Sequence, residues 1–325
     1  MEKVLLTGAA GFIGAYTARE LVKQGFYVIG IDNLNDYYDP KLKEHRLELL
    51  SALENFEFEK IDIEDREGLK KVFDKHDIKA VINLAARAGV RYSMEHPHLY
   101  MNTNAVGTLN LLEEIRERGI KKLVLASTSS LYAGQEMPFL ESLAVNTPIS
   151  PYAASKKAAE VMAYSYHYLY GIDVSVVRYF TVYGPAGRPD MCIYRFIKWI
   201  NEGTPITLFG NGSQARDFTF VEDIAKGTVC ALKEVGYEIF NLGGGKNPIS
   251  LNEIIKKIEV SLDKKCERDL KPFHKADINE TWADISKAKD ILGWEPTVSI
   301  DDGLKESIDW YKTNIDFLNT IELPE

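Results

Sequence analysis

Cysteine is scarce in this chain: Cys192, Cys230 and Cys266 are three residues among 325, and no two of them form a Cys-x-x-Cys pair. An odd set without that spacing argues against a disulfide scaffold and against a cysteine-rich zinc site. Positive charge is also in short supply, with 39 Lys and Arg against 48 Asp and Glu and a formal net charge of −9. We therefore expect neither nucleic acid nor an anionic membrane as a partner. An anionic ligand would have to be held by a few local cations.

Long apolar runs are missing as well. No stretch approaches the ~18 consecutive apolar residues of a membrane span, and the first residues pass directly from Val4-Leu5-Leu6 into a glycine-rich turn without the apolar segment of a signal peptide. The Gly-x-Ser-x-Gly motif of the α/β-hydrolases is absent. His96 and His98 flank Pro97 and lack the geometry of metal ligands. We expect a reduced, cytoplasmic protein without a resident metal.

What the sequence does contain is a regular alternation of short apolar segments with helix-length amphipathic segments. The expected strands cover residues 4–7, 27–31, 56–60, 80–83, 122–126 and 174–178. The expected helices cover residues 15–24, 41–53, 66–76, 100–118 and 153–170. Such alternation is typical of parallel βαβ units, so we predict an α/β fold with a Rossmann, doubly wound parallel sheet.

The alternation stops after residue 178. Glycine and proline become dense in 183–190 and again in 203–212, and the segments that follow are shorter. We expect one domain over residues 1–180, which a strand near 237–243 also joins, and a smaller α/β lobe, discontinuous in sequence, over 181–325. No flexible linker separates them, which predicts direct packing with a cleft between the two.

Three glycines mark the first turn. Gly8, Gly11 and Gly14 follow an expected strand and open an expected helix, where they allow a tight turn, a close backbone approach to a pyrophosphate and close packing of helix on strand. The helix N-terminus offers free N–H groups to phosphates. Asp32 ends the second strand, where its carboxylate can accept hydrogen bonds from ribose hydroxyls and would repel a 2′-phosphate. The pattern predicts NAD rather than NADP.

A tyrosine and a lysine four residues apart suggest a general base. Tyr152 and Lys156 share a helix face, and a nearby ammonium would lower the pKa of the phenol toward neutrality. The same spacing recurs at Tyr37/Lys41 and at Tyr194/Lys198, where we expect solvated or packing residues. Position favours Tyr152, because it begins a helix after the fourth and fifth strands.

Two further features have alternative interpretations. Asp62-Ile63 follows the third strand, where it could meet an adenine edge, but an ordinary helix-capping aspartate would look the same. The serine and threonine residues of 127–130 end the fifth strand at the carboxyl edge of the sheet, where ligands bind in such folds. A serine-rich turn without function is the alternative there.

With these residues in place, the sequence resembles the extended short-chain dehydrogenases/reductases, in particular the nucleotide-sugar epimerases and dehydratases, over nearly its whole length. The motifs that carry the resemblance are Thr7-Gly-Ala-Ala-Gly-Phe-Ile-Gly14, Asn83-Leu-Ala-Ala86, Tyr152-x-x-x-Lys156, Arg178-Tyr-Phe-Thr-Val-Tyr-Gly-Pro185 and Arg216-Asp-Phe-Thr-Phe-Val-Glu-Asp223. Three narrower matches, Asp32-Asn-Leu-Asn-Asp-Tyr-Tyr-Asp39, Ala88-Gly-Val-Arg-Tyr-Ser93 and Gly187-Arg-Pro-Asp-Met191, resemble the UDP-glucuronate 4-epimerase branch. Arg87 stands where that branch often has Gln.

The resemblance implies roles for individual residues. Tyr152 would be the base, Lys156 its partner and Thr128 the hydroxyl that bridges to the sugar O4. Implied NAD-binding residues are Gly8, Gly11, Phe12, Ile13, Gly14, Asp32, Asn33, Asp62, Ile63, Leu84, Ala85, Ala86, Asn104, Ser127, Tyr152, Lys156 and Tyr179. Implied substrate-binding residues are Arg91, Ser129, Ser130, Thr181, Arg188, Thr207, Phe209, Arg216 and Asp277, with Arg188 near the sugar carboxylate, Arg216 near the UDP ribose or phosphates and 204–209 near uracil.

The reaction implied by the resemblance is an NAD-dependent 4-epimerisation of UDP-glucuronate to UDP-galacturonate through a transient 4-keto sugar, by a homodimer. Such a keto acid loses CO₂ readily, and Ser129, Ser130 and Arg188 could hold its carboxylate out of the alignment that cleavage needs. The alternatives are the same chemistry on UDP-glucose or UDP-N-acetylglucosamine and, in another class, a catalytically silent NAD-binding regulator. Arg188 distinguishes the first alternative, and the Tyr152/Lys156 pair argues against the second.

Overall fold

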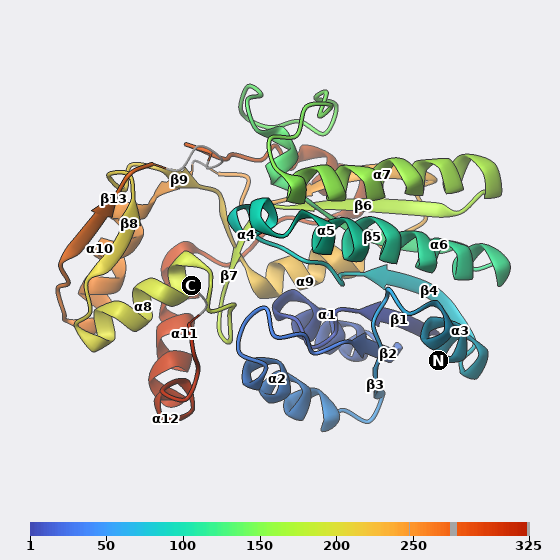
Figure 1. Cartoon of the computed structure of the whole chain (residues 1–325), viewed down its shortest axis with the longest axis horizontal. Helices are drawn as coiled ribbons and strands as arrows, with labels where there is room; N and C mark the ends of the chain where they lie inside the picture. Colours follow the sequence, from blue (N-terminus) through green and yellow to red (C-terminus); the bar gives the residue numbers. More distant parts are fainter. Residues whose placement is uncertain (247, 274–277, 324–325) are drawn as a thin grey trace.

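A computed structural model describes residues 1–246, 248–273 and 278–323 of the chain (Figure 1). Among these residues, seven parallel strands form one sheet in the order β11-β6-β5-β4-β1-β2-β3. The strands of this sheet are β1 (Lys3–Thr7), β2 (Tyr27–Asp32), β3 (Phe56–Lys60), β4 (Ile78–Asn83), β5 (Lys122–Thr128), β6 (Asp173–Tyr179) and β11 (Tyr237–Leu242). The α/β fold with a doubly wound parallel sheet is confirmed.

Helices cover both faces of the sheet, which explains why its strands are almost continuously apolar. One face packs against α1 (Phe12–Lys23), α2 (Lys41–Ser51) and α9 (Val221–Cys230). The other face packs against α3 (Arg66–Lys75), α6 (Gly107–Glu117) and α7 (Pro151–Tyr170). Two short helices, α4 (Val90–Glu95) and α5 (Pro97–Tyr100), lie between β4 and α6 in the chain.

The remaining elements gather at one end of the sheet, on the left in Figure 1, around a core of their own. They pair as three small two-stranded sheets: β7 (Thr181–Tyr183) with β10 (Phe218–Phe220), β9 (Ala215–Arg216) with β12 (Ile249–Ser250), and β8 (Ile206–Phe209) with β13 (Arg268–Lys271). The helices at this end are α8 (Cys192–Glu202), α10 (Leu251–Leu262), α11 (Ile300–Thr313) and α12 (Ile315–Leu318). The elements of this lobe are built from separated segments, because α9 and β11 return to the large sheet in between.

The helix expected over 100–118 is present, but it is not regular along its whole length. A π-helical turn at Met101–Val106 precedes α6, and Asn104 within that turn uses its side chain to bond the backbone of Arg87 and the hydroxyl of Ser155. Single π-helical turns inside α-helices occur often at functional sites. The first helix begins at Phe12 rather than at residue 15, directly after the Gly11 N-cap. Its first free N–H groups therefore lie within the glycine-rich turn.

No helix among the described residues combines the length and the apolar character that a membrane crossing requires.

Candidate active site

A cavity of about 410 Å³ opens at the carboxyl edge of the large sheet, a size typical of small-molecule sites. The glycine-rich turn, the ends of β2, β4 and β5, the start of α7 and the 184–190 loop between β7 and α8 all contribute to its wall. Most residues predicted for the site line this cavity: Gly8, Gly11, Phe12, Ile13, Gly14, Asp32, Asn33, Asp62, Ile63, Leu84, Ala85, Ala86, Ser127, Thr128, Ser129, Ser130, Tyr152, Lys156, Tyr179, Thr181 and Arg188.

The glycine-rich turn has the shape of a phosphate cradle. Gly8 has φ +70°, a conformation that L side chains rarely adopt, and a Cβ there would lie 2.8 Å from the backbone nitrogen of Ala85. A Cβ at Gly14 would lie 2.0 Å from the carbonyl oxygen of Gly8. The turn therefore needs glycine at both positions, and it places the N-terminus of α1 beside the cavity. These residues fit a dinucleotide such as NAD.

Asp32 and Lys43 face the cavity together where β2 ends. The Asp32 carboxylate is almost fully buried, accepts a bond from the backbone N–H of Leu34 at 2.8 Å and lies 3.8 Å from the Lys43 ammonium. Burial lowers the pKa of Lys43 to about 8, with Asp32 opposing the shift and Arg46, Arg87 and Arg188 adding to it. Sequence reasoning missed Lys43, because its distance of 11 residues from Asp32 corresponds to no motif.

Asp62 is not the cap of the following helix. Asp65 caps α3 by accepting a bond from the backbone N–H of Gly68, whereas Asp62 accepts bonds from Asn33 at 2.7 Å and from the backbone of Glu64. Of the two interpretations left open above, the structure therefore favours a position on the cavity wall over a capping role.

Tyr152 lies at the start of α7 and lines the cavity together with Thr128 at the end of β5. Thr128 accepts a bond from the backbone N–H of Ser130 at 3.1 Å, which fixes its side chain. Burial raises the pKa of Tyr152 above its usual value, and the Thr128 hydroxyl and the charge of Arg188 act in the opposite direction. The expectation that Lys156 brings this pKa toward neutrality is wrong, since burial dominates and the pKa is raised.

Lys156 lies one turn further along α7 and is 3% exposed. Burial lowers its pKa to about 8, with Glu160 opposing the shift. Glu160 is itself buried and holds Arg178 of β6 through two bonds of 2.9 and 2.8 Å, while Ser127 donates to it at 2.6 Å. This buried pair joins α7 to β6 one helical turn beyond Lys156.

Arg188 already has a carboxylate partner within its own loop. Its guanidinium donates two bonds to Asp190 and lies 5.6 Å from the ring centre of Tyr37. Burial opposes a rise in the pKa of Arg188, but Asp190, Tyr37 and Tyr38 together outweigh it and the pKa is raised. Tyr37, expected to be a solvated or packing residue, lines the cavity, as does Asp190.

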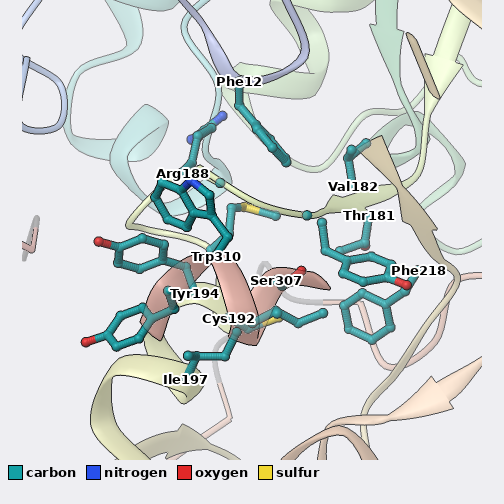
Figure 2. A pocket seen from close by; sticks show the side chains of 16 residues that line it. Phe12, Thr181, Val182, Arg188, Cys192, Tyr194, Ile197, Phe218, Ser307 and Trp310 are labelled. Atoms are coloured by element: carbon teal, nitrogen blue, oxygen red, sulfur yellow. The ribbon is translucent and has the colours of Figure 1, made fainter. Parts of the chain in front are cut away.

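A second, smaller pocket lies beside the cavity and is shown in Figure 2. Phe12 and Arg188 lie at one end of the view and Ile197 at the other, with Cys192 and Trp310 between them. Phe12, Thr181 and Arg188 belong to the walls of both hollows. Its volume of about 20 Å³ leaves room for roughly one water molecule, so it is a packing space behind the site.

Five described residues from the predicted set lie outside the lining of the large cavity: Arg91, Asn104, Thr207, Phe209 and Arg216. Arg91 stacks on Phe209, with the guanidinium carbon 3.8 Å from the ring centre, and so connects α4 to β8. Arg216 donates to the carbonyls of Ala215 and Asn279. Asp277 lies outside the described residues.

The sequence of the chain is similar to a known family and to named relatives. Residues 5–307 match the family model described as GDP-mannose 4,6 dehydratase. A UDP-glucuronate 4-epimerase of Thermodesulfobacterium geofontis is 59% identical over 99% of this chain and 100% of its own length. UDP-glucuronate 4-epimerase 4 of Arabidopsis thaliana is 41% identical over 95% of this chain and 75% of its own.

Solved structures agree with these relatives. The UDP-glucuronic acid 4-epimerase of Bacillus cereus, in complex with UDP-glucuronic acid and NAD, superposes with a TM-score of 0.90 at 37% identity and covers 96% of this chain and 99% of that one. A UDP-glucose 4-epimerase of Thermotoga maritima with UDP-glucose gives a TM-score of 0.87 at 30% identity, with 96% and 99% covered.

Proposed function

Because the chain belongs to the GDP-mannose 4,6-dehydratase family of extended short-chain dehydrogenases/reductases, we propose that it is an isomerase that interconverts UDP-glucuronate and UDP-galacturonate with NAD. One observation carries the proposal: Tyr152 and Thr128 line the same cavity as Ser129, Ser130 and the glycine-rich turn. The relatives named for UDP-glucuronate 4-epimerisation support the choice of sugar.

The chain's own residues divide the work between binding and proton transfer. The glycine-rich turn and Asp32 hold the dinucleotide through its pyrophosphate and adenosine ribose. NAD, when bound, supplies the hydride acceptor and returns the hydride to the opposite face of the sugar. Tyr152 takes the proton of the sugar O4 through Thr128 and later gives it back. Lys156 supplies a positive charge that offsets part of the cost of forming a buried phenolate, although burial keeps the pKa of Tyr152 raised.

Ser129 and Ser130 protect the 4-keto acid from losing CO₂. They follow Thr128 in a 3₁₀ turn at the end of a buried strand, so their backbone positions are fixed. A hydroxyl held in this way can keep the sugar carboxylate out of line with the carbonyl π system. Arg188, whose charge Asp190 compensates in part, adds attraction for that carboxylate.

The test is to incubate the purified chain with UDP-glucuronate, UDP-glucose and UDP-N-acetylglucosamine and to identify the products by NMR. We expect UDP-galacturonate from the first sugar, no released CO₂, and a far slower reaction with the other two. Equal turnover of UDP-glucose would favour the neutral-sugar alternative, for which the 30% identity to a UDP-glucose 4-epimerase is the supporting observation. Binding of NAD without any turnover would favour a silent regulator.

The chain divides, in this proposal, into an NAD-binding domain over 1–180, which also includes the strand near 237–243, and a UDP-sugar-binding lobe over 181–325. It assembles as a homodimer in the cytoplasm. An apolar face on α7 supports the dimer: Val161, Tyr168 and Leu169 are 50%, 77% and 63% exposed, and Val106 of the adjoining π-helical turn is 48% exposed. An apolar face of this kind is typical of subunit contacts. Sedimentation of the wild type and of Tyr168→Glu tests it, with a dimer and a monomer as the expected results.

A further inference from the structure

Arg46 of α2 lies outside the residues assigned a role in the reaction, yet its side chain is only 2% exposed and fully engaged. Nε donates to the carbonyl of Ala186 at 3.1 Å, and Nη2 donates to the same carbonyl at 2.8 Å and to that of Gly187 at 3.4 Å. Nη1 donates to the carbonyl of Ala10 at 3.1 Å and to the Tyr38 hydroxyl at 2.8 Å. An arginine has five N–H donors, and all five are used.

The acceptors of Arg46 belong to three separate parts of the site. Ala10 lies in the glycine-rich turn, Tyr38 lies in the segment that follows β2, and Ala186 and Gly187 lie in the 184–190 loop that carries Arg188. None of these five bonds goes to a carboxylate. The guanidinium therefore fixes the relative positions of backbone segments and does not neutralise an acidic side chain.

Hydrogen bonds from residues outside the loop stabilise the conformation of the 184–190 loop. Ala186 has φ +53°, a left-handed conformation that is unfavourable for a residue with a Cβ. Its carbonyl receives two of the bonds from Arg46, and the neighbouring Pro185 carbonyl accepts a third bond from the Tyr16 hydroxyl at 3.1 Å. Tyr16 belongs to α1, the helix that the glycine-rich turn opens. Both donors thus connect the loop to the NAD-binding part of the chain.

We propose that Arg46 is a positioning residue that couples the glycine-rich turn to the 184–190 loop, so that NAD binding at the turn sets the place of Arg188 for the UDP-sugar. This inference rests on the proposed function for the identity of the sugar, but the coupling itself concerns only the chain and NAD. Lysine cannot replace Arg46 in this role. All three N–H donors of a lysine belong to a single nitrogen atom, which cannot reach acceptors in three separate segments.

The first test measures the coupling without a sugar. Hydrogen exchange of peptides covering 184–190 is followed with and without NAD in the wild type, in Arg46→Lys and in the control Lys41→Ala. Lys41 lies on the same helix and donates to the Thr320 carbonyl at 2.9 Å, so the control removes a different long-range contact of α2. NAD should slow exchange of the loop in the wild type and in the control, and have no effect on it in Arg46→Lys. The same slowing in all three proteins overturns the proposal.

The second test uses calorimetric titration of the NAD-loaded proteins with UDP-glucuronate. Arg46→Lys should bind about tenfold more weakly, equivalent to about 1.4 kcal/mol, and this loss should disappear in the Arg188→Ala background because Arg46 acts through Arg188. A purely structural role would lower the melting temperature and leave the affinity of the folded protein unchanged.

If Arg46→Lys does not fold, Tyr16→Phe decides, since it removes only the bond to Pro185. This variant should keep the wild-type melting temperature, bind UDP-glucuronate about threefold more weakly and show a smaller effect of NAD on hydrogen exchange of the loop. Wild-type UDP-glucuronate affinity together with a wild-type effect of NAD on exchange overturns the proposal. A wild type that binds NAD and shows the loop effect but binds no UDP-glucuronate would refute the proposed function and leave the coupling supported.

Discussion

Two buried lysines face the cavity, and each loses its charge more easily than a lysine in water. Lys43 and Lys156 both have a pKa lowered to about 8 by burial. Their unfolded-state pKa is near 10.5, so the unfolded chain binds more protons between these two values, and these groups make folding more favourable as the pH rises from about 8 to 10.5. Activity and stability should therefore respond to alkaline pH in opposite directions.

The pH profile of kcat/KM tests the role of Lys156. Because kcat/KM reports groups of the free enzyme, it should fall as the pH rises through about 8, where the ammonium beside Tyr152 is lost. In Lys156→Arg, whose guanidinium stays charged, the residual activity should lack this falling limb. A falling limb that persists unchanged would assign it to another group, with Lys43 as the first candidate.

Replacing Tyr152 with Phe isolates the phenol oxygen. The ring packs edge-on against Tyr100, with ring centres 6.0 Å apart, and that contact survives the change. Turnover should fall on the order of 10²-fold or more, while NAD binding and the melting temperature stay as in the wild type. The measurements are product formation, NADH fluorescence titration and thermal unfolding. Normal turnover would remove Tyr152 from the mechanism.

At the scale of single elements, we expect the Arg178–Glu160 ion pair between β6 and α7 to be the contact whose loss by mutation destabilises the chain most. Arg178 and Glu160 are each 1% exposed, and Arg178 also donates to Tyr132, whose hydroxyl donates to Asn241 of β11. Removing one member of such a pair leaves a buried charge without compensation. The pair thus joins three elements around the proposed catalytic residues.

Arg178→Met should destabilise the chain by about 3–5 kcal/mol, measured by urea unfolding. The control is Arg118→Met, which removes more exposed ion pairs to Glu114 and Asp74 and should cost less than about 1 kcal/mol. The double variant Glu160→Gln/Arg178→Met should recover part of the loss. Equal stability of the wild type and Arg178→Met would show that this join contributes little.

Elements with a local sequence signal were predicted from the sequence, and features that depend on contacts between distant residues were not. Hydrophobic period and turn residues predicted the six expected strands and the glycine-rich turn, because burial on both faces and a positive φ at Gly8 leave local signals. The π-helical turn at Met101–Val106 contains Asn104, which bonds Ser155 51 positions away, and local sequence pattern does not record such a long-range contact. Lys43, Tyr37 and Asp190 were missed as cavity residues for the same reason.

At the scale of the whole molecule, charge is distributed unevenly. The chain carries a net charge of −9, yet Lys43, Arg87, Lys156 and Arg188 all line one cavity. Among the described residues, only Asp32, Asp62 and Asp190 are carboxylates in the same lining. Local cations therefore oppose the repulsion that the acidic surface exerts on an anionic substrate.

Salt should weaken this local attraction. We expect the KM for UDP-glucuronate to rise roughly threefold between about 50 and 500 mM salt, since screening acts on charges at the open side of the cavity. The comparison is the KM of Arg188→Ala, which should rise less because one of the attracting charges is gone. A KM that does not change with salt would mean that short-range hydrogen bonds and packing, and not screened charge attraction, bind the substrate.

The position of β11 has a consequence for synthesis on the ribosome. β11 pairs with β6 along its full length, but 57 residues separate Tyr179 from Tyr237. While that intervening segment is being translated, the outer edge of β6 has no partner, and an unpaired edge strand attracts other chains. Nascent chains stalled before Leu242 emerges should be protease-sensitive and bound by chaperones, and chains stalled well after it should resist the protease. Protease resistance that appears before β11 has left the ribosomal exit tunnel would show that the other six strands form a stable sheet without β11.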